Sequence, residues 1–267
     1  MPVIGVYWQF VRMGFRRESR YLSAALAGLV ANVVFGLIKA AVLLGAAQAA
    51  GGTVAGYTTG MLSAYVWLSQ GMLGAVTLSG SAEIGERIRT GDIAVDLARP
   101  VDVQLAHLAT DLGRATFTFV PRGLPSVAIG LLFVGMTMPT TVLPYVLGVV
   151  SLYLGITLSF LCRFAVNLVG FWTIETRGVQ NLYMVASSFL SGLFVPVPIF
   201  PDWLQAIALS TPFPSIMMTP IDILSGRIGG LDAVAAMAVQ VGWVLLIGLA
   251  GHLLLVAGQR KLEVQGG

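Results

Sequence analysis

Charged residues are scarce in this chain of 267 residues. They make up 10% of the sequence, against about 25% in soluble globular proteins, and hydrophobic residues make up 57%. The mean hydropathy is +0.87. This composition excludes an ordinary soluble domain. It predicts an all-α polytopic membrane protein, because long apolar segments cross a bilayer as helices.

Cysteine, histidine and lysine are also rare, and each shortage excludes a kind of site. Cys162 is the single cysteine, so no disulfide forms within the chain, and His107 and His252 belong to no cluster with metal-ligand spacing. Neither Lys39 nor Lys261 follows a glycine, as the Gly-Lys pair of a P-loop requires. We therefore expect no metal, no bound cofactor and no enzymatic activity of its own. The net charge of +3 is too small to indicate nucleic acid.

Apolar runs account for most of the chain, and six of them predict membrane spans. They cover residues 22–48, 54–80, 123–138, 142–168, 179–196 and 233–257. The third is short, and Pro121 and Pro125 blur its start. Six spans place both termini on one side of the membrane.

The positive charges indicate which side that is. If both termini are cytoplasmic, thirteen of the fifteen Lys and Arg residues lie inside or at the inner interface, with Arg122 and Arg163 among them. Arg227 lies outside, and Lys39 lies within the first span. This asymmetry follows the positive-inside rule and predicts a membrane protein with cytoplasmic termini.

The N-terminal residues have the pattern of an amphipathic helix. Apolar side chains recur at helical spacing, and basic ones gather at the C-terminal side; they are Ile4, Trp8, Val11 and Phe15, and Arg12, Arg16, Arg17 and Arg20. This pattern favours a helix lying in the interface, with its arginines towards anionic membrane lipid. An irregular extension of the first span is the alternative.

Residues 196–231 contain six prolines, too many for one continuous helix. We expect an external cap here that lies on or dips into the outer leaflet. Gly52, Gly56 and Gly60 form a small-residue motif that permits close helix packing.

Polar residues inside the spans have two interpretations. Lys39 serves transport or snorkels to the outer interface, and Arg163 with Asn167 is expected to anchor to headgroups. A solvated pair is expected for His107 and Asp111, and a hydrogen bond across helices for His252. Polar stripes on the second and fifth spans line a substrate pathway or pack helix against helix: Thr59, Ser63 and Gln70, and Asn181, Met184, Ser188 and Ser191.

The stretch from Ser81 to Gln104 is the one long polar segment, with eight charges between positions 83 and 102. It must lie in water as a loop at the membrane surface. Residues 91–100 read GDIAVDLARP, and this string resembles the first cytoplasmic loop of permease subunits of bacterial type-2 ABC exporters. The resemblance extends over nearly the whole chain.

This resemblance implies a function in which the first loop docks as a coupling helix on a separate ABC ATP-binding subunit, which binds the ATP and magnesium. A second permease chain, identical or paralogous, completes the pathway, and the substrate is hydrophobic or amphipathic. The implied coupling residues are Glu83, Glu86, Arg87, Arg89, Gly91, Asp92, Asp96 and Arg99, with Glu175 and Arg177 as a smaller contact. A stand-alone channel, a secondary transporter and a membrane enzyme remain alternatives, although no internal repeat or catalytic cluster favours them.

We accordingly divide the chain into six segments. They are an interfacial helix (1–21), spans one and two (22–80), a cytoplasmic coupling loop with a surface helix (81–118), spans three to five (119–198), an external Pro-rich cap (199–231), and span six with a cytoplasmic tail (232–267).

Overall fold

The computed structural model describes residues 3–173 and 175–265, and the side chains of residues 5–173 and 175–261. The expected apolar side chain of Ile4 lies outside these residues. The elements follow along the chain as α1 (Val3–Ser19), α2 (Leu22–Ala49), β1 (Thr53–Val54), β2 (Tyr57–Thr58), α3 (Thr59–Met72), α4 (Glu83–Thr90), α5 (Ile93–Leu97), α6 (Val103–Thr118), η1 (Phe119–Gly123), α7 (Leu124–Ile129), η2 (Gly130–Val134), α8 (Leu143–Leu168), η3 (Val169–Phe171), α9 (Arg177–Leu190), η4 (Val197–Ile199), α10 (Asp202–Leu209), α11 (Phe213–Leu224) and α12 (Gly230–Gln265).

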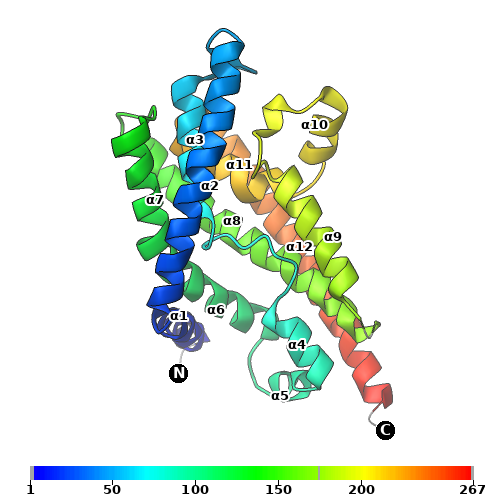
Figure 1. The fold of residues 1–267 in the computed structure, drawn as a ribbon. Helices are drawn as coiled ribbons and strands as arrows, with labels where there is room; N and C mark the ends of the chain where they lie inside the picture. The colour runs from blue at the N-terminus through cyan, green and yellow to red at the C-terminus, as the bar shows by residue number, and fades with distance from the viewer. Residues whose placement is uncertain (1–2, 174, 266–267) are drawn as a thin grey trace.

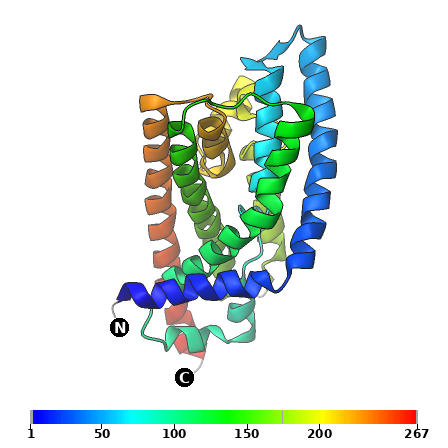
Figure 2. The ribbon, with the colours of Figure 1, turned by 90° about the vertical axis from the view of Figure 1, so that its left-hand side faces the viewer.

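The long helices form an elongated bundle with two different ends (Figure 1). At one end α1 lies across the bundle, transverse to α2 (Figure 2). The short helices α4 and α5 and the last turns of α12 lie at this same end, whereas the β1–β2 hairpin and α10 lie at the other. The charged stretch and the proline-rich segment are therefore at opposite ends of the molecule.

Four helical segments are long and apolar enough to cross a membrane: Leu22–Ala49, Val103–Val134, Leu143–Phe171 and Gly230–Lys261. The pair α10 and α11, bent by 98°, makes a fifth if it is one broken span. The helices α3 and α9 have 14 residues each, about 21 Å at 1.5 Å per residue, which is short of the roughly 30 Å hydrocarbon core. The expectation of a mostly helical polytopic membrane protein is confirmed, but six full-length spans are not found among the described helices.

The expected surface helix and third span are one helical path from Val103 to Val134. Pro121 lies in η1, a π-helical turn. Proline lacks the N–H of a regular helical bond and crowds the preceding turn, and a wider turn accommodates it. Pro125 lies in the first turn of α7, where a missing N–H costs little. The prolines therefore modify this helix instead of ending it.

Two of the three glycines of the motif, Gly52 and Gly56, lie in a turn before α3, whereas Gly60 lies in the first turn of α3. Gly52 and Gly56 have φ angles of +95° and +81° and flank the two-residue strands β1 and β2. Glycine adopts this left-handed backbone without the steric cost of a Cβ atom. The predicted helix-packing function of Gly52 and Gly56 is therefore wrong.

The core is organised around α3. Every residue from Leu62 to Met72 is buried, and Trp67 is wholly buried between α2 and the α7–η2 helix, close to Gly36 and Gly130. A helix that is buried on all sides has neighbours on all sides. This burial makes α3 the central helix of the chain, although it is one of the shorter ones.

Candidate functional site

The charged stretch folds into two short helices separated by a glycine turn. Glu83 and Glu86 lie in the first turn of α4 and Arg87 and Arg89 in its last turn, an order that complements the helix dipole. Gly91 ends the helix with φ +83°, in the left-handed region where other residues are strained. We call residues 83–99 the docking element.

The docking element is fixed to the bundle by isoleucines. Ile84 and Ile88 of α4 and Ile93 of α5 are buried, in one apolar cluster with Phe164 and Leu168 of α8. Burying such a side chain stabilises by about 1.5–3 kcal/mol. The docking element is thus packed on the bundle and is not a free loop.

Arg87 and Asp96 tie the two short helices together. Two nitrogens of Arg87 donate to the Asp96 carboxylate, and Arg87 also donates to the carbonyl of Asp92 at 3.3 Å. The Asp96 carboxylate raises the pKa of Arg87. Asp96 is buried, and Arg99 lies 3.4 Å from it. Whether Arg87 and Asp96 also contact a partner stays a prediction; within this chain they stabilise the docking element.

Other predicted coupling residues form an exposed face. Glu86, Arg89, Asp92 and Arg99 are exposed, and so is the apolar Val95 at 56%. Arg89 donates to Glu86 at 2.5 and 3.0 Å, and this bond lowers the pKa of Glu86, so both remain charged at neutral pH. Charged side chains around an exposed valine on a fixed support suit recognition by another protein.

The second predicted contact lies beside the first. Glu175 and Arg177 are exposed, and Glu175 accepts a hydrogen bond from the Arg177 amide at 2.9 Å. A hollow of about 250 Å³ between α4 and the start of α9 is lined by Arg89 and Thr176, among others. The structure thus brings the two coupling segments together, although about 80 residues separate them in sequence.

An extended segment, residues 73–82, joins the docking element to α3 where the sequence predicted more helix. Five of its carbonyls accept hydrogen bonds from side chains of α6, α8 and α9 instead of from backbone. The pairs are Gly74 and Ala75 with Arg114, Thr77 with Ser159, Leu78 with Ser187, and Gly80 with Asn167, at 2.5–3.0 Å. Buried carbonyls need such partners, so these side chains fix the path of the segment.

Asn167 and Arg163 do not anchor to headgroups as expected, because both are buried. Asn167 also accepts from the Ala82 amide and from Gln180 of α9, at 3.3 and 2.8 Å. Together with Ser159, they are spaced four residues apart on α8. This polar row in an apolar helix is a sequence signal from which an internal contact face could have been predicted.

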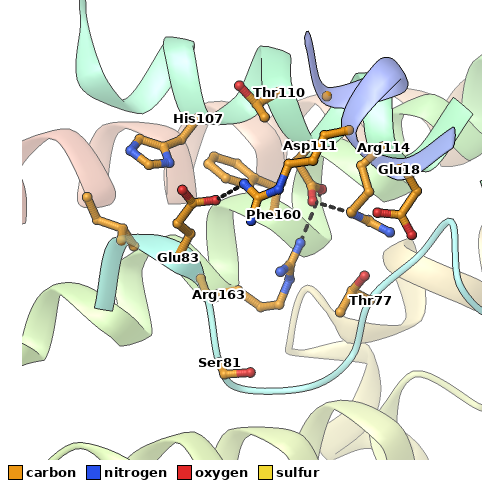
Figure 3. Close-up of a pocket in the computed structure, with 14 residues that line it drawn as sticks. Glu18, Thr77, Ser81, Glu83, His107, Thr110, Asp111, Arg114, Phe160 and Arg163 are labelled. Carbon is orange, nitrogen blue, oxygen red and sulfur yellow. Dashed lines mark hydrogen bonds and ion pairs between the residues drawn. The ribbon is translucent and has the colours of Figure 1, made fainter. Parts of the chain in front are cut away.

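A hollow of about 500 Å³ lies where α1, α4, α6 and α8 meet (Figure 3). Asp111 lies between Arg114 and Arg163, at 2.8 and 3.1 Å. Across the hollow, Arg17 of α1 donates to Glu83 of α4 at 2.7 Å. One ion pair thus joins the interfacial helix to the docking element, and the other joins α6 to α8.

The two histidines have different neighbours from those expected. Asp111 pairs with arginines and not with His107, whose Nε2 lies 3.9 Å from Asp96. The expected solvated pair of His107 and Asp111 is therefore wrong. His252 lies 3.9 Å from Asp102, with about half of its side chain exposed.

The polar stripe on α3 is buried within the chain. Ser63 and Gln70 are 1% and 4% exposed, and Gln70 lies close to Gly36 of α2. Thr59 is half-buried at the start of the helix. Of the two interpretations, this placement favours helix packing for Ser63 and Gln70.

The stripe on α9 is divided. Asn181 and Met184 are exposed, Ser188 is half-buried, and Ser191 is buried. A pathway function is compatible with the exposed pair and stays a prediction.

Two cations lie inside the bundle. Lys39 donates to the Leu193 carbonyl at 2.5 Å and to Ser69 at 3.0 Å, so it joins α2 to α3 and to the segment after α9 and does not snorkel. Arg122, expected at the inner interface, donates to Asn32 at 2.8 Å. Asn32 is ten residues into α2, about 15 Å from its start. Among the described residues, Arg122 has no carboxylate partner.

These features define a class. A mostly helical bundle with four or five membrane-crossing segments and a charged element fixed at one end is a multi-pass membrane protein. A family model described as ABC-2 family transporter protein matches residues 34–266. The chain therefore belongs to the ABC-2 transporter family. Membership identifies it as a membrane permease component of an ABC transporter, a class that works with an ATP-binding subunit. No curated protein matches the chain significantly.

Proposed function

We propose that the chain is the permease subunit of an ABC exporter and that the docking element is the surface on which the ATP-binding subunit acts. One observation carries the proposal: a charged, exposed face is held on buried isoleucines beside Glu175 and Arg177. The same end of the bundle carries the interfacial helix and the last turns of α12. We place this end in the cytoplasm.

Force passes from the docking element to the centre of the bundle along the extended segment. The partner binds ATP and magnesium, closes, and moves α4. The segment 73–82 transmits the movement to α3, to which it is directly connected. Its hydrogen bonds to α6, α8 and α9 make those helices move as well. The permease needs only two arrangements that the motor favours differently.

The substrate moves outward, from the cytoplasm or the inner leaflet, and is hydrophobic or amphipathic. A second permease chain, identical or paralogous, lies against the apolar outer faces of α2 and α9. Phe35 and Leu182, exposed at 65% and 71%, lie on these faces. Asn181 and Met184 then face the shared pathway.

The test is a pull-down with an ABC ATP-binding subunit that copurifies with the wild-type chain, with ATPase measured in liposomes. A charge swap, Glu86→Arg with Arg89→Glu, keeps the internal ion pair but inverts the face offered to the partner. We expect at least tenfold weaker binding and loss of stimulated ATPase. The thermal unfolding midpoint of the permease should fall only slightly, because the swap opposes the helix dipole at two exposed positions. Glu83 and Arg87 are poorer targets, since both hold other elements in place.

The matched control is Asp202→Arg on α10, an exposed charge at the opposite end. It should bind and stimulate the ATPase like the wild type. Normal coupling in the swapped variant contradicts the proposal. Substrate flux through the chain without any ATPase favours a channel or a secondary transporter.

A further inference from the structure

A second hollow lies on the opposite side of α1 from the docking element. It has a volume of about 590 Å³ and is formed by α1, α6 and α8; most of its lining is apolar, from Trp8, Val11, Phe15, Leu112 and Tyr153. Its two hydroxyls, of Thr116 and Tyr153, bind each other at 2.9 Å. The interior therefore offers an apolar surface with its polar groups already paired.

Arginines border this hollow without neutralising partners. Arg12 and Arg16 line it, and Arg20 continues the row one turn further. None of the three forms an ion pair with another described residue, in contrast to Arg17, which binds Glu83. Like charges four residues apart on a helix repel each other. The described part of the chain thus supplies no anion for this row, and a bound molecule would have to supply it.

The hollow is preformed because α1 is closely packed on α6. A Cβ atom on Gly14 would lie 2.0 Å from the Thr110 carbonyl oxygen, and one on Gly113 would lie 1.9 Å from that of Val11. Phe15 and Phe117 add an edge-to-face contact with ring centroids 5.3 Å apart. The apolar wall and the guanidinium groups consequently keep a fixed relation.

We propose that this hollow binds one anionic phospholipid. Its phosphate lies between Arg12 and Arg16, and an acyl chain lies against Phe15, Leu112 and Tyr153. Charge complementarity selects this occupant, because the ammonium group of a zwitterionic lipid offsets the charge of its phosphate, and a free anion leaves the apolar wall exposed. The inference goes beyond the proposed function, since it holds whatever substrate the chain moves.

The experiment measures phosphatidylglycerol binding to the full chain, delipidated in a non-ionic detergent, by native mass spectrometry. An arginine beside an anionic headgroup contributes about fivefold in affinity, so Arg12→Gln with Arg16→Gln should weaken binding roughly 30-fold. Phosphatidylcholine should bind the wild type about as weakly as phosphatidylglycerol binds this variant. Thr116→Trp, which fills the hollow and leaves the arginines, should also weaken phosphatidylglycerol binding.

The matched control removes two exposed arginines elsewhere, Arg99→Gln with Arg177→Gln, and should bind phosphatidylglycerol like the wild type. Equal thermal midpoints without lipid show that all variants are folded. Equal binding of phosphatidylcholine, or an unchanged affinity in the Arg12 and Arg16 variant, overturns the proposal. If millimolar inorganic phosphate competes with phosphatidylglycerol, or if Thr116→Trp binds phosphatidylglycerol normally, the proposed acyl-chain contact is wrong and the arginines form only an anion site.

Discussion

Asn167 shows how one buried amide can determine the path of a whole segment. It is fully buried, donates to the Gly80 carbonyl at 2.7 Å, and accepts from the Ala82 amide. An unpaired buried polar group costs about 1–3 kcal/mol. Asn167 thus stabilises the irregular backbone between α3 and the docking element.

Replacement of Asn167 by leucine keeps the branching of the side chain and removes every one of these bonds. We expect the free energy of unfolding to fall by at least about 2 kcal/mol, because more than one buried group loses its partner. A lower thermal unfolding midpoint in detergent is the measurement. Asn181→Leu, on the exposed face of α9, is the control and should leave the midpoint nearly unchanged. Equal midpoints for both variants would show that the extended segment does not depend on this side chain.

At the scale of elements, the packing of α1 on α6 fixes the interfacial helix to the bundle. The crossing depends on Gly14 and Gly113, where any side chain would collide with backbone. Since Arg17 of α1 binds Glu83 of α4, a shift of α1 would also disturb the docking element.

Gly14→Ala tests this packing with a single methyl group. A Cβ atom 2.0 Å from a carbonyl oxygen forces α1 away from α6, and such overpacking costs about 1–3 kcal/mol. We expect faster tryptic cleavage at the arginines of α1. Gly242→Ala on α12, where nothing lies within 4 Å, should cleave like the wild type or more slowly. If Gly14→Ala is cleaved as slowly as Gly242→Ala, the close packing of α1 on α6 is wrong.

At the scale of the molecule, the charged and the proline-rich ends determine a direction. The docking element and α1 share one end, and α10 and the hairpin share the other. If the charged end is cytoplasmic, α10 faces outside.

Single-cysteine labelling measures this orientation. In a Cys162→Ala background, Val95→Cys on α5 and Trp203→Cys on α10 introduce thiols at positions 56% and 66% exposed. An impermeant maleimide should label the first in inverted vesicles only and the second in intact cells only. Labelling of both from one side would overturn the orientation, and an exchange of sides would invert it.

The sequence alone determined the membrane class, the amphipathic α1, the bounds of α2 and α8 and the start of α12 within a few residues, and the exposed charged loop. These features depend on composition and helical periodicity, which are local. The GDIAVDLARP string indicated a resemblance to ABC transporter permeases, and the family match supports the transporter class.

Only the tertiary structure decided where the buried polar groups lie. The sequence predicts headgroup anchors at Arg163 and Asn167, whereas in the structure both are buried and Asn167 donates to the extended segment. The early end of α3, the continuous helix past Pro121 and the closeness of Glu175 to α4 likewise depend on contacts between segments far apart in the chain. Periodicity describes one helix at a time, whereas the pairing of a buried carbonyl with a distant side chain is a property of the packed bundle.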